Sequence, residues 1–261
     1  MDLGLTGKRA LITGGSKGIG LAAATRMAQE GASVAIVARR LDALEEAKAA
    51  ILAVAPGANV LCVSADVSTA EGTAAAAAEV LGAFGGLDIL VNNAGRSAGG
   101  RALEQDDSIW QTDLDLKFFG ALRMTRLCHD ALRESGAGAG LNVTAIQGKT
   151  PTAGASPTAI SRAAGIALTK ALSKELAPEN IRVNTVCIGL IKSEQIERAA
   201  RGRFPDLPLD QAYARMGEGV PLGRVGETEE AGDVIAFLCS PRAGFVTGVA
   251  LNLDGGTASV T

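Results

Sequence analysis

Short runs of apolar residues alternate along this chain with longer segments in which apolar positions recur at helical spacing. A run of about four to eight apolar residues is typical of a strand buried on both faces, whereas a recurrence every three or four residues is typical of a helix. The runs predict strands near residues 9–13, 33–38, 59–64, 87–91, 140–144, 181–188 and 248–253. The periodic segments predict helices near residues 18–30, 41–54, 69–84, 107–134, 158–177 and 228–239.

This alternation predicts a single α/β domain of the doubly wound, Rossmann type, with a seven-stranded parallel sheet flanked by helices. We find no internal repeat and no linker in the 261 residues. The least regular segment, 192–224, contains three prolines amid charged residues. Because ligands in this class bind beyond the carboxyl ends of the strands, and 192–224 follows one such end, we expect a substrate lid there. A plain surface insertion is the alternative.

Composition narrows the class of protein. The net charge of −3 and the lack of a basic run speak against a nucleic-acid partner, and no apolar stretch is long enough for a signal peptide or a membrane span. The four cysteines are far apart, and three lie in apolar runs, so we expect buried, reduced thiols and a cytoplasmic protein. With His129 as the only histidine, we expect no metal site.

The most informative motif is LITGGSKGIG at residues 11–20, where an apolar run leads into a glycine turn and then a helical pattern. Unpaired amides and the helix dipole at such a helix start attract phosphate. Gly14, Gly18 and Gly20 would allow the tight turn, the approach of a pyrophosphate and close helix–sheet packing. An ordinary strand-to-helix turn is the alternative.

The glycine spacing, preceded by Thr13, resembles that of the short-chain dehydrogenase/reductase family. Further motifs of that family follow in order: Asp66-Val67 after a strand, NNAG at 92–95, NIRVNTVCIG at 180–189 and DGG at 254–256. The resemblance covers nearly the whole chain, from about residue 7 to residue 256. It implies a nicotinamide cofactor and oxidoreduction of a small carbonyl compound or alcohol.

The resemblance also implies which residues would bind the cofactor. In this fold an acidic residue after the second strand suits NAD(H), and a basic residue suits the 2′-phosphate of NADP(H). Arg39 occupies that place and Lys17 lies in the glycine turn, so NADP(H) is favoured over NAD(H), unless Arg39 is merely a solvated charge. The implied cofactor-binding residues are Gly14, Ser16, Lys17, Gly18, Ile19, Gly20, Arg39, Asp66, Val67, Asn93, Ala94, Gly95, Arg162, Gly189, Ile191 and Ser193.

The catalytic residues of the family are absent at the matching positions. Where the family has Asn, Ser, Tyr and Lys, this chain has Lys117, Ala145, Thr158 and Arg162. The only tyrosine, Tyr213, is followed four residues later by glycine, so no shift of alignment restores the Tyr–Lys pair. Arginine can keep the positive charge but is no acid near neutral pH, and the threonine hydroxyl is a far weaker acid than a phenol.

Lys117 is therefore the notable replacement. A lysine near Arg162 in a partly dry cleft would more readily give up its proton, and could act as a proton donor, a nucleophile or an anchor for a substrate carboxylate. A salt bridge to Asp113 or Asp115 is the structural alternative. Lys149 is a weaker candidate, His129 is expected to be structural, and Tyr213 could reach the site only on segment 192–224.

Three functions remain open from the sequence. The first is an NADP(H)-dependent oxidoreductase that uses Lys117, Thr158 and Arg162, with Lys117 or the substrate itself as the proton donor. The second is a lyase or isomerase on the same scaffold, and the third is an inactive NADP(H)-binding protein. The paired cations suggest an anionic small-molecule substrate. From the resemblance we expect a homodimer or homotetramer, and we expect no membrane partner.

Overall fold

The computed structural model describes residues 1–260 and contains the predicted sheet. Seven parallel strands lie in the order β3-β2-β1-β4-β6-β8-β9, so the doubly wound topology is confirmed. Each of these seven strands overlaps a predicted one. The strands are β1 Arg9–Thr13, β2 Ser33–Ala38, β3 Val60–Ser64, β4 Ile89–Asn92, β6 Ala139–Ala145, β8 Arg182–Ile188 and β9 Ala250–Leu253.

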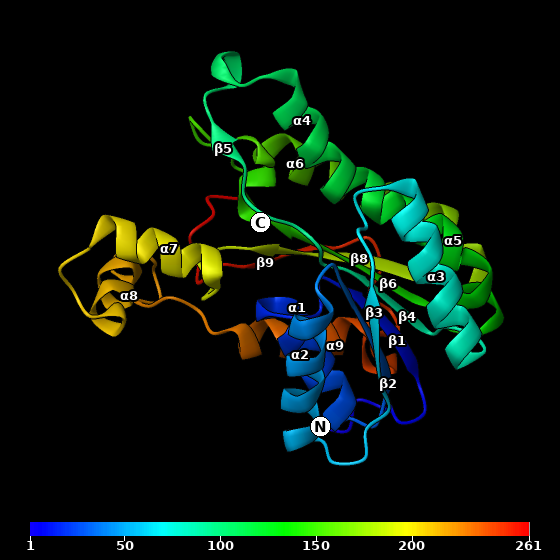
Figure 1. Ribbon diagram of the computed structural model, residues 1–261. Coiled ribbons are helices and arrows are strands. Elements are labelled where there is room, and N and C mark those ends of the chain that lie inside the picture. Colours follow the sequence, from blue (N-terminus) through cyan, green and yellow to red (C-terminus); the bar gives the residue numbers. More distant parts are fainter. Residues whose placement is uncertain (261) are drawn as a thin grey trace.

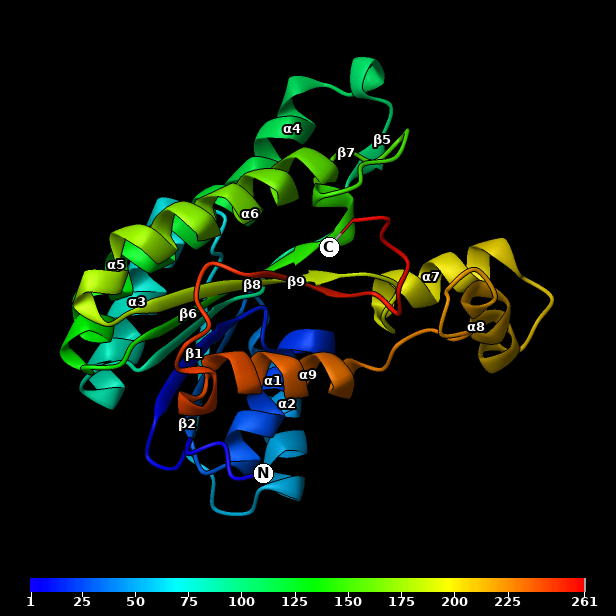
Figure 2. The ribbon, with the colours of Figure 1, turned by 180° about the vertical axis from the view of Figure 1, so that it is seen from behind.

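Helices cover both faces of this sheet (Figures 1 and 2). One layer consists of α1 Gly18–Gln29, α2 Leu41–Val54 and α9 Thr228–Cys239, and the other of α3 Ala70–Phe84, α5 Gly120–Glu134 and α6 Thr158–Glu175. Two apolar cores fill the space between the sheet and each layer. Most residues of β1, β2 and β4 in the middle of the sheet are buried, which explains why their sequences are largely apolar runs, whereas β9 at the edge is only partly buried.

We predicted one continuous helix over 107–134, and that prediction was wrong because the helix is interrupted. It consists of α4 Asp107–Leu114, a π-helical turn at Asp115–Phe119 and then α5. Gly120 follows the π-turn at a place where the chain passes close to the loop after β3. A Cβ on Gly120 would lie 2.7 Å from the Val67 carbonyl oxygen, so this close approach requires glycine. Such π-turns are frequent at functional sites, and this one carries Lys117.

We expected segment 192–224 to be irregular, but it is partly helical. It contains two short helices, α7 Glu194–Arg203 and α8 Leu209–Gly217, which project beside the carboxyl ends of the strands (Figure 1). Pro205 and Pro208 lie between the two helices, and Pro208 immediately precedes α8, whereas Pro221 follows α8. Ser193 caps α7 by accepting a hydrogen bond from the Ile196 amide at 3.3 Å.

A small two-stranded antiparallel sheet was not predicted. It pairs β5 Gly99–Gly100 with β7 Ser156–Pro157. This pairing joins the loop after β4 to the start of α6, above the carboxyl edge of the main sheet (Figure 2). Strands of two residues that contain Gly and Pro carry almost no apolar periodicity, which is why the sequence pattern missed them.

Candidate active site

The glycine turn lies between β1 and α1 and has the tight geometry that the motif predicted. Gly14 and Gly18 have φ angles of 65° and 55°, which favour glycine. A Cβ on Gly14 would lie 2.9 Å from the Ala94 Cα, and a Cβ on Gly20 would collide with the Gly14 carbonyl oxygen. A Cβ on Gly18 would meet no atom within 4 Å, so the outer side of the turn is open.

Asn93 locks the glycine turn to the loop that follows β4. Its side-chain amide donates to the carbonyl oxygens of Thr13 and Gly14, both at 3.0 Å. The Thr13 hydroxyl in turn accepts from the amides of Asn93 and Ala94 at 3.0 and 3.1 Å. Asn93 and Ala94 therefore hold two of the expected cofactor-binding loops at one edge of the sheet.

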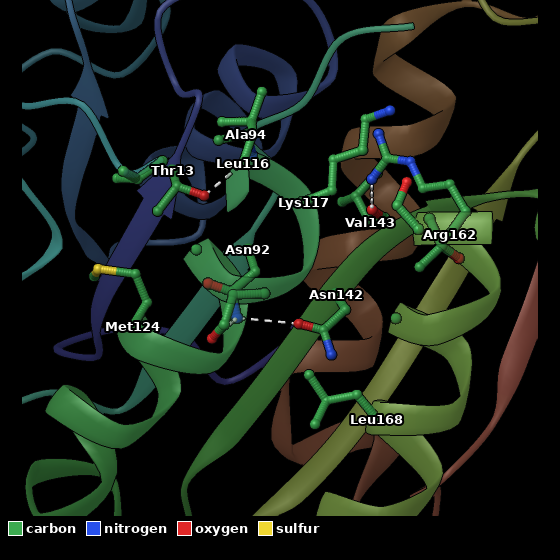
Figure 3. A pocket seen from close by; sticks show the side chains of 16 residues that line it. Thr13, Asn92, Ala94, Leu116, Lys117, Met124, Asn142, Val143, Arg162 and Leu168 are labelled. Atoms are coloured by element: carbon green, nitrogen blue, oxygen red, sulfur yellow. Dashed lines mark hydrogen bonds between the residues drawn. The ribbon is translucent and has the colours of Figure 1, made fainter. Parts of the chain in front are cut away.

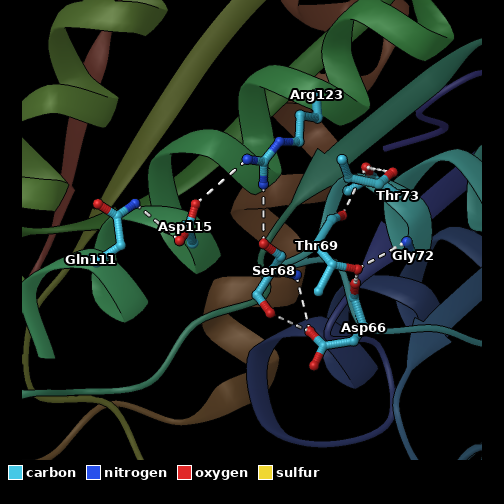
Figure 4. Close-up of polar contacts among 9 residues, drawn as sticks. Asp66, Ser68, Thr69, Gly72, Thr73, Gln111, Asp115 and Arg123 are labelled. Atoms are coloured by element: carbon cyan, nitrogen blue, oxygen red, sulfur yellow. Dashed lines mark hydrogen bonds and ion pairs between the residues drawn. The ribbon is translucent and has the colours of Figure 1, made fainter. Parts of the chain in front are cut away.

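Asp66 and Val67 form the neighbouring wall, after β3. The Asp66 carboxylate accepts hydrogen bonds from the amide and the hydroxyl of Ser68 (Figure 4). Burial alone would raise the pKa of Asp66, but these hydrogen bonds and the charge of Arg39 lower it. Arg123 donates to the Ser68 carbonyl oxygen at 3.0 Å and also lies 3.5 Å from Asp115, so this loop is tied to the π-turn.

The expected residues of the β8 side lie across the same edge. A Cβ on Gly189 would lie 2.5 Å from the Asp254 Cβ, so this glycine permits the C-terminal DGG motif to pack against it. Ile191 forms a bridge to Gly226, and Ser193 caps α7. Lys17 in the glycine turn forms an ion pair with Glu194 of α7 at 2.9 Å, and Arg39 is exposed at the end of β2.

Lys117 lies in a buried polar network, where both its side chain and that of Asp113 are 1% exposed. Its ammonium group pairs with Asp113 and donates to the Thr158 hydroxyl at 2.8 Å. The second Asp113 oxygen accepts from Ser161 at 2.6 Å. The structure therefore selects Asp113, not Asp115, as the ion-pair partner that the sequence left open.

Arg162, on α6, points toward Lys117, and its guanidinium lies close to the Lys117 ammonium group (Figure 3). Burial and the charge of Arg162 lower the pKa of Lys117 to about 8, although Asp113 opposes this shift. Burial likewise lowers the pKa of Arg162 to about 10. Arg162 donates to the Val143 carbonyl oxygen at 2.6 Å, and its Nη2 would lie 2.5 Å from a Cβ on Gly95. Two cations therefore lie near one buried carboxylate, which pairs with Lys117 alone.

Thr158 begins α6 and accepts two hydrogen bonds, from Lys117 Nζ and from the Ala98 amide at 2.8 Å. A hydroxyl group has two acceptor positions and one donor hydrogen. We find no acceptor for that hydrogen among residues 1–260. The Thr158 side chain is buried, and a cavity of about 10 Å³, enough for one water molecule, is lined by Lys117 and Arg162 among others.

The remaining candidates lie outside this network. Lys149 donates to the Ala250 carbonyl oxygen at 2.6 Å. His129 Nε2 lies 2.9 Å from Glu179, on the part of α5 that leads away from the π-turn. Tyr213 lies on α8, where the Lys192 ammonium sits 5.4 Å from its ring centre. No cluster of three potential metal-binding side chains occurs among the described residues.

Ser161 is the member of the network that sequence reasoning missed. The signal was present, because Ser161 stands three residues after Thr158 and so shares its face of the helix. Ala145 ends β6 and offers no hydroxyl group. Among residues 1–260 no helix combines the length and the apolar character needed to cross a bilayer.

Comparison with known proteins agrees with this geometry. The family model described as Enoyl-(Acyl carrier protein) reductase matches residues 14–258. The human protein Dehydrogenase/reductase SDR family member 4 is 33% identical over 256 residues, which cover 98% of this chain and 89% of that protein.

Solved structures agree over the same length. An L-sorbose reductase from Gluconobacter frateurii, in complex with NADPH and L-sorbose, has a TM-score of 0.95 at 35% identity, with complete coverage of both chains. A short-chain oxidoreductase from Pseudomonas aeruginosa, bound to NADPH and said to contain an atypical catalytic center, has a TM-score of 0.91 at 32% identity, covering 97% of this chain and 98% of its own. Motifs, topology and both kinds of likeness lead to one conclusion: the chain belongs to the short-chain dehydrogenase/reductase family.

Proposed function

We propose that the protein is an NADP(H)-dependent oxidoreductase of small carbonyl compounds or alcohols that works without the family's Ser, Tyr and Lys. Lys117, Thr158 and Arg162 would act instead. One observation carries this proposal: the Lys117 ammonium lies 2.8 Å from a Thr158 hydroxyl whose own hydrogen is free to be donated. The NADPH complexes of two similar proteins support the cofactor.

The residues at the edge of the sheet fit a dinucleotide. Helix α1 has no side-chain cap, so its first amides are available to an anion, and the open side of Gly18 leaves room for a diphosphate. Asp66, Val67, Asn93 and the segment from Gly189 to Ser193 would line the rest of the site. Exposed Lys17 and Arg39, with no acidic residue at the end of β2, support NADP(H) over NAD(H).

When bound, the nicotinamide would supply or accept the hydride. The protein would then deliver a proton to the carbonyl oxygen in two linked transfers: Thr158 gives its hydroxyl hydrogen to that oxygen and takes a hydrogen from Lys117. An aliphatic hydroxyl alone is too weak an acid, whereas a lysine with a pKa of about 8 can give up a proton near neutral pH. The product would be an alcohol, and Lys117 would be left neutral.

Arg162 would remain charged throughout, because its pKa stays at about 10 even when buried. Its charge would stabilise the negative charge that develops on the carbonyl oxygen. Asp113 would hold Lys117 in place, supported by Ser161. Asp113 pairs with Lys117 and not with Arg162, so the two cations near this carboxylate leave a surplus positive charge, which supports an anionic substrate.

We also propose that segment 192–224 is a lid over the site. Two contacts support this: Lys17 with Glu194, and the Ser97 amide with the Gln195 side chain at 2.7 Å.

A homodimer or homotetramer through α5 and α6 is consistent with the exposure of Leu127 and Ile160 on those helices.

The test is a panel of carbonyl compounds, with and without a carboxylate, assayed by the nicotinamide absorbance of NADPH. Lys117→Met and Thr158→Ala are each expected to lower kcat about 10²–10⁴-fold, the usual loss for a general acid. Thr158→Ser keeps the hydroxyl and should retain most activity. Lys174→Met, an exposed lysine at the end of α6, serves as the matched control.

Three outcomes would count against this assignment. Full activity in Lys117→Met would remove Lys117 from the mechanism. Turnover of a substrate with no net change in nicotinamide oxidation would favour the lyase or isomerase alternative. Binding of NADPH with no turnover across the panel would favour the inactive binding protein.

A further inference from the structure

The first turn of α7 spans the gap between the two loops that border the proposed cofactor site. Its Glu194 carboxylate meets Lys17 of the glycine turn at 2.9 Å, and its Gln195 side chain meets the Ser97 amide at 2.7 Å. Ser193, just before this turn, fixes the direction of the helix by capping it. Glu194 therefore pairs with Lys17, the lysine of the glycine turn that is expected to bind a phosphate of the cofactor.

Glu194 faces several cations, of which Lys17 is the nearest. The Lys17 hydrogen bond lowers the pKa of Glu194, with smaller effects from Arg198 and Arg40. Arg40 is already paired with Asp42, so it contributes little free charge. Both side chains of the Lys17–Glu194 pair are half or more exposed, at 50% and 62%. Exposed pairs of this kind are weak, so a stronger anion can replace the carboxylate.

We infer that Glu194 moderates the preference for NADP(H) by competing with its 2′-phosphate for Lys17. This inference rests on the proposed NADP(H) cofactor. A 2′-phosphate carries up to about two negative charges near neutral pH and is the stronger partner for an ammonium group. Binding it requires the Lys17–Glu194 pair to open and leaves a carboxylate near the phosphate.

The consequence is a penalty that falls on NADP(H) and hardly on NAD(H), which has no 2′-phosphate. Glu194 thus moderates an affinity that Lys17 and Arg39 would otherwise make tighter. In an oxidoreductase such a penalty speeds release of the spent cofactor, because affinity differences between related complexes lie mostly in the dissociation rate.

The experiment is calorimetric titration of the purified protein with NADPH and NADH. Glu194→Gln is expected to tighten NADPH binding about two- to fivefold, the range for an exposed ion pair, and to change NADH binding by much less. Glu197→Gln is the matched control, because Glu197 lies one turn further along α7 and pairs with Arg201 at 2.7 Å. It should change neither affinity.

A second variant completes the cycle. Lys17→Met should weaken NADPH binding. Adding Glu194→Gln in that background should have no further effect, because the lysine ammonium for which Glu194 and the 2′-phosphate compete is then absent. Unchanged NADPH affinity in Glu194→Gln, or equal tightening for NADH, would overturn the inference while leaving the cofactor proposal intact. A wild type that prefers NADH, or binds neither nucleotide, would overturn the cofactor proposal and the inference together.

Discussion

Substitution of Asp113 by asparagine probes the buried network most directly. Asp113→Asn removes the carboxylate from Lys117 while leaving the lysine buried and facing Arg162. Breaking a buried ion pair by removing one partner costs about 3–5 kcal/mol, because the remaining charge is left without compensation. We expect a loss of that size in the free energy of unfolding at pH 6, where Lys117 still holds its proton.

The loss should depend on pH in a defined direction. The pKa of Lys117 is about 8 in the folded protein against an ordinary 10.5, and Asp113 raises it, so Asp113→Asn lowers it further. Between the folded and unfolded values the unfolded chain binds more protons, so stability rises with pH. The deficit of Asp113→Asn relative to wild type should therefore shrink by up to about 1.4 kcal/mol per pH unit until about pH 8, and stay constant above it.

The assay is urea unfolding followed by circular dichroism at several pH values and one protein concentration. The double variant Asp113→Asn/Lys117→Met lacks the buried cation, so it should be more stable than Asp113→Asn at pH 6 and should lack the pH dependence. A deficit below about 1 kcal/mol at pH 6, or an equal pH dependence in the double variant, would refute the reasoning.

Three further predictions follow from the structure. The kcat/KM for carbonyl reduction should fall above about pH 8, because Lys117 must be protonated to supply a proton, and Asp113→Asn should move that fall to lower pH; an unmoved profile would contradict the assignment. Gly20→Ala should lower the melting temperature and weaken NADPH binding, because a Cβ there collides with the Gly14 carbonyl oxygen. The control Gly82→Ala in α3, whose Cβ would meet no atom within 4 Å, should instead raise the free energy of unfolding by about 0.5–1 kcal/mol. In thiol titration Cys62 should react first, because burial raises the pKa of Cys128 and Cys239 to about 12; fast reaction of more than one thiol in the native protein would contradict this.

Much of the fold could be predicted because its signals are local. Strands buried on both faces are mostly apolar, so β1 and β2 are visible as apolar runs. The glycine motif is equally local, because Gly14 and Gly20 are required by contacts within one turn and its neighbouring loop. The π-turn at Asp115–Phe119 was missed because its sequence keeps an ordinary helical pattern, and one extra residue per turn leaves no compositional trace.

From the sequence alone we could predict the topology, and we could propose the edge for the cofactor and the candidate residues Lys117, Ala145, Thr158 and Arg162. How the candidate residues meet is visible only in the folded domain. It selected Asp113 as the partner of Lys117, added Ser161, and joined Thr158 to Lys117 across 41 residues of chain. It also placed Glu194 against Lys17, 177 residues away. Periodicity records which face of an element is buried, whereas a hydrogen bond between distant elements depends on packing of the whole domain.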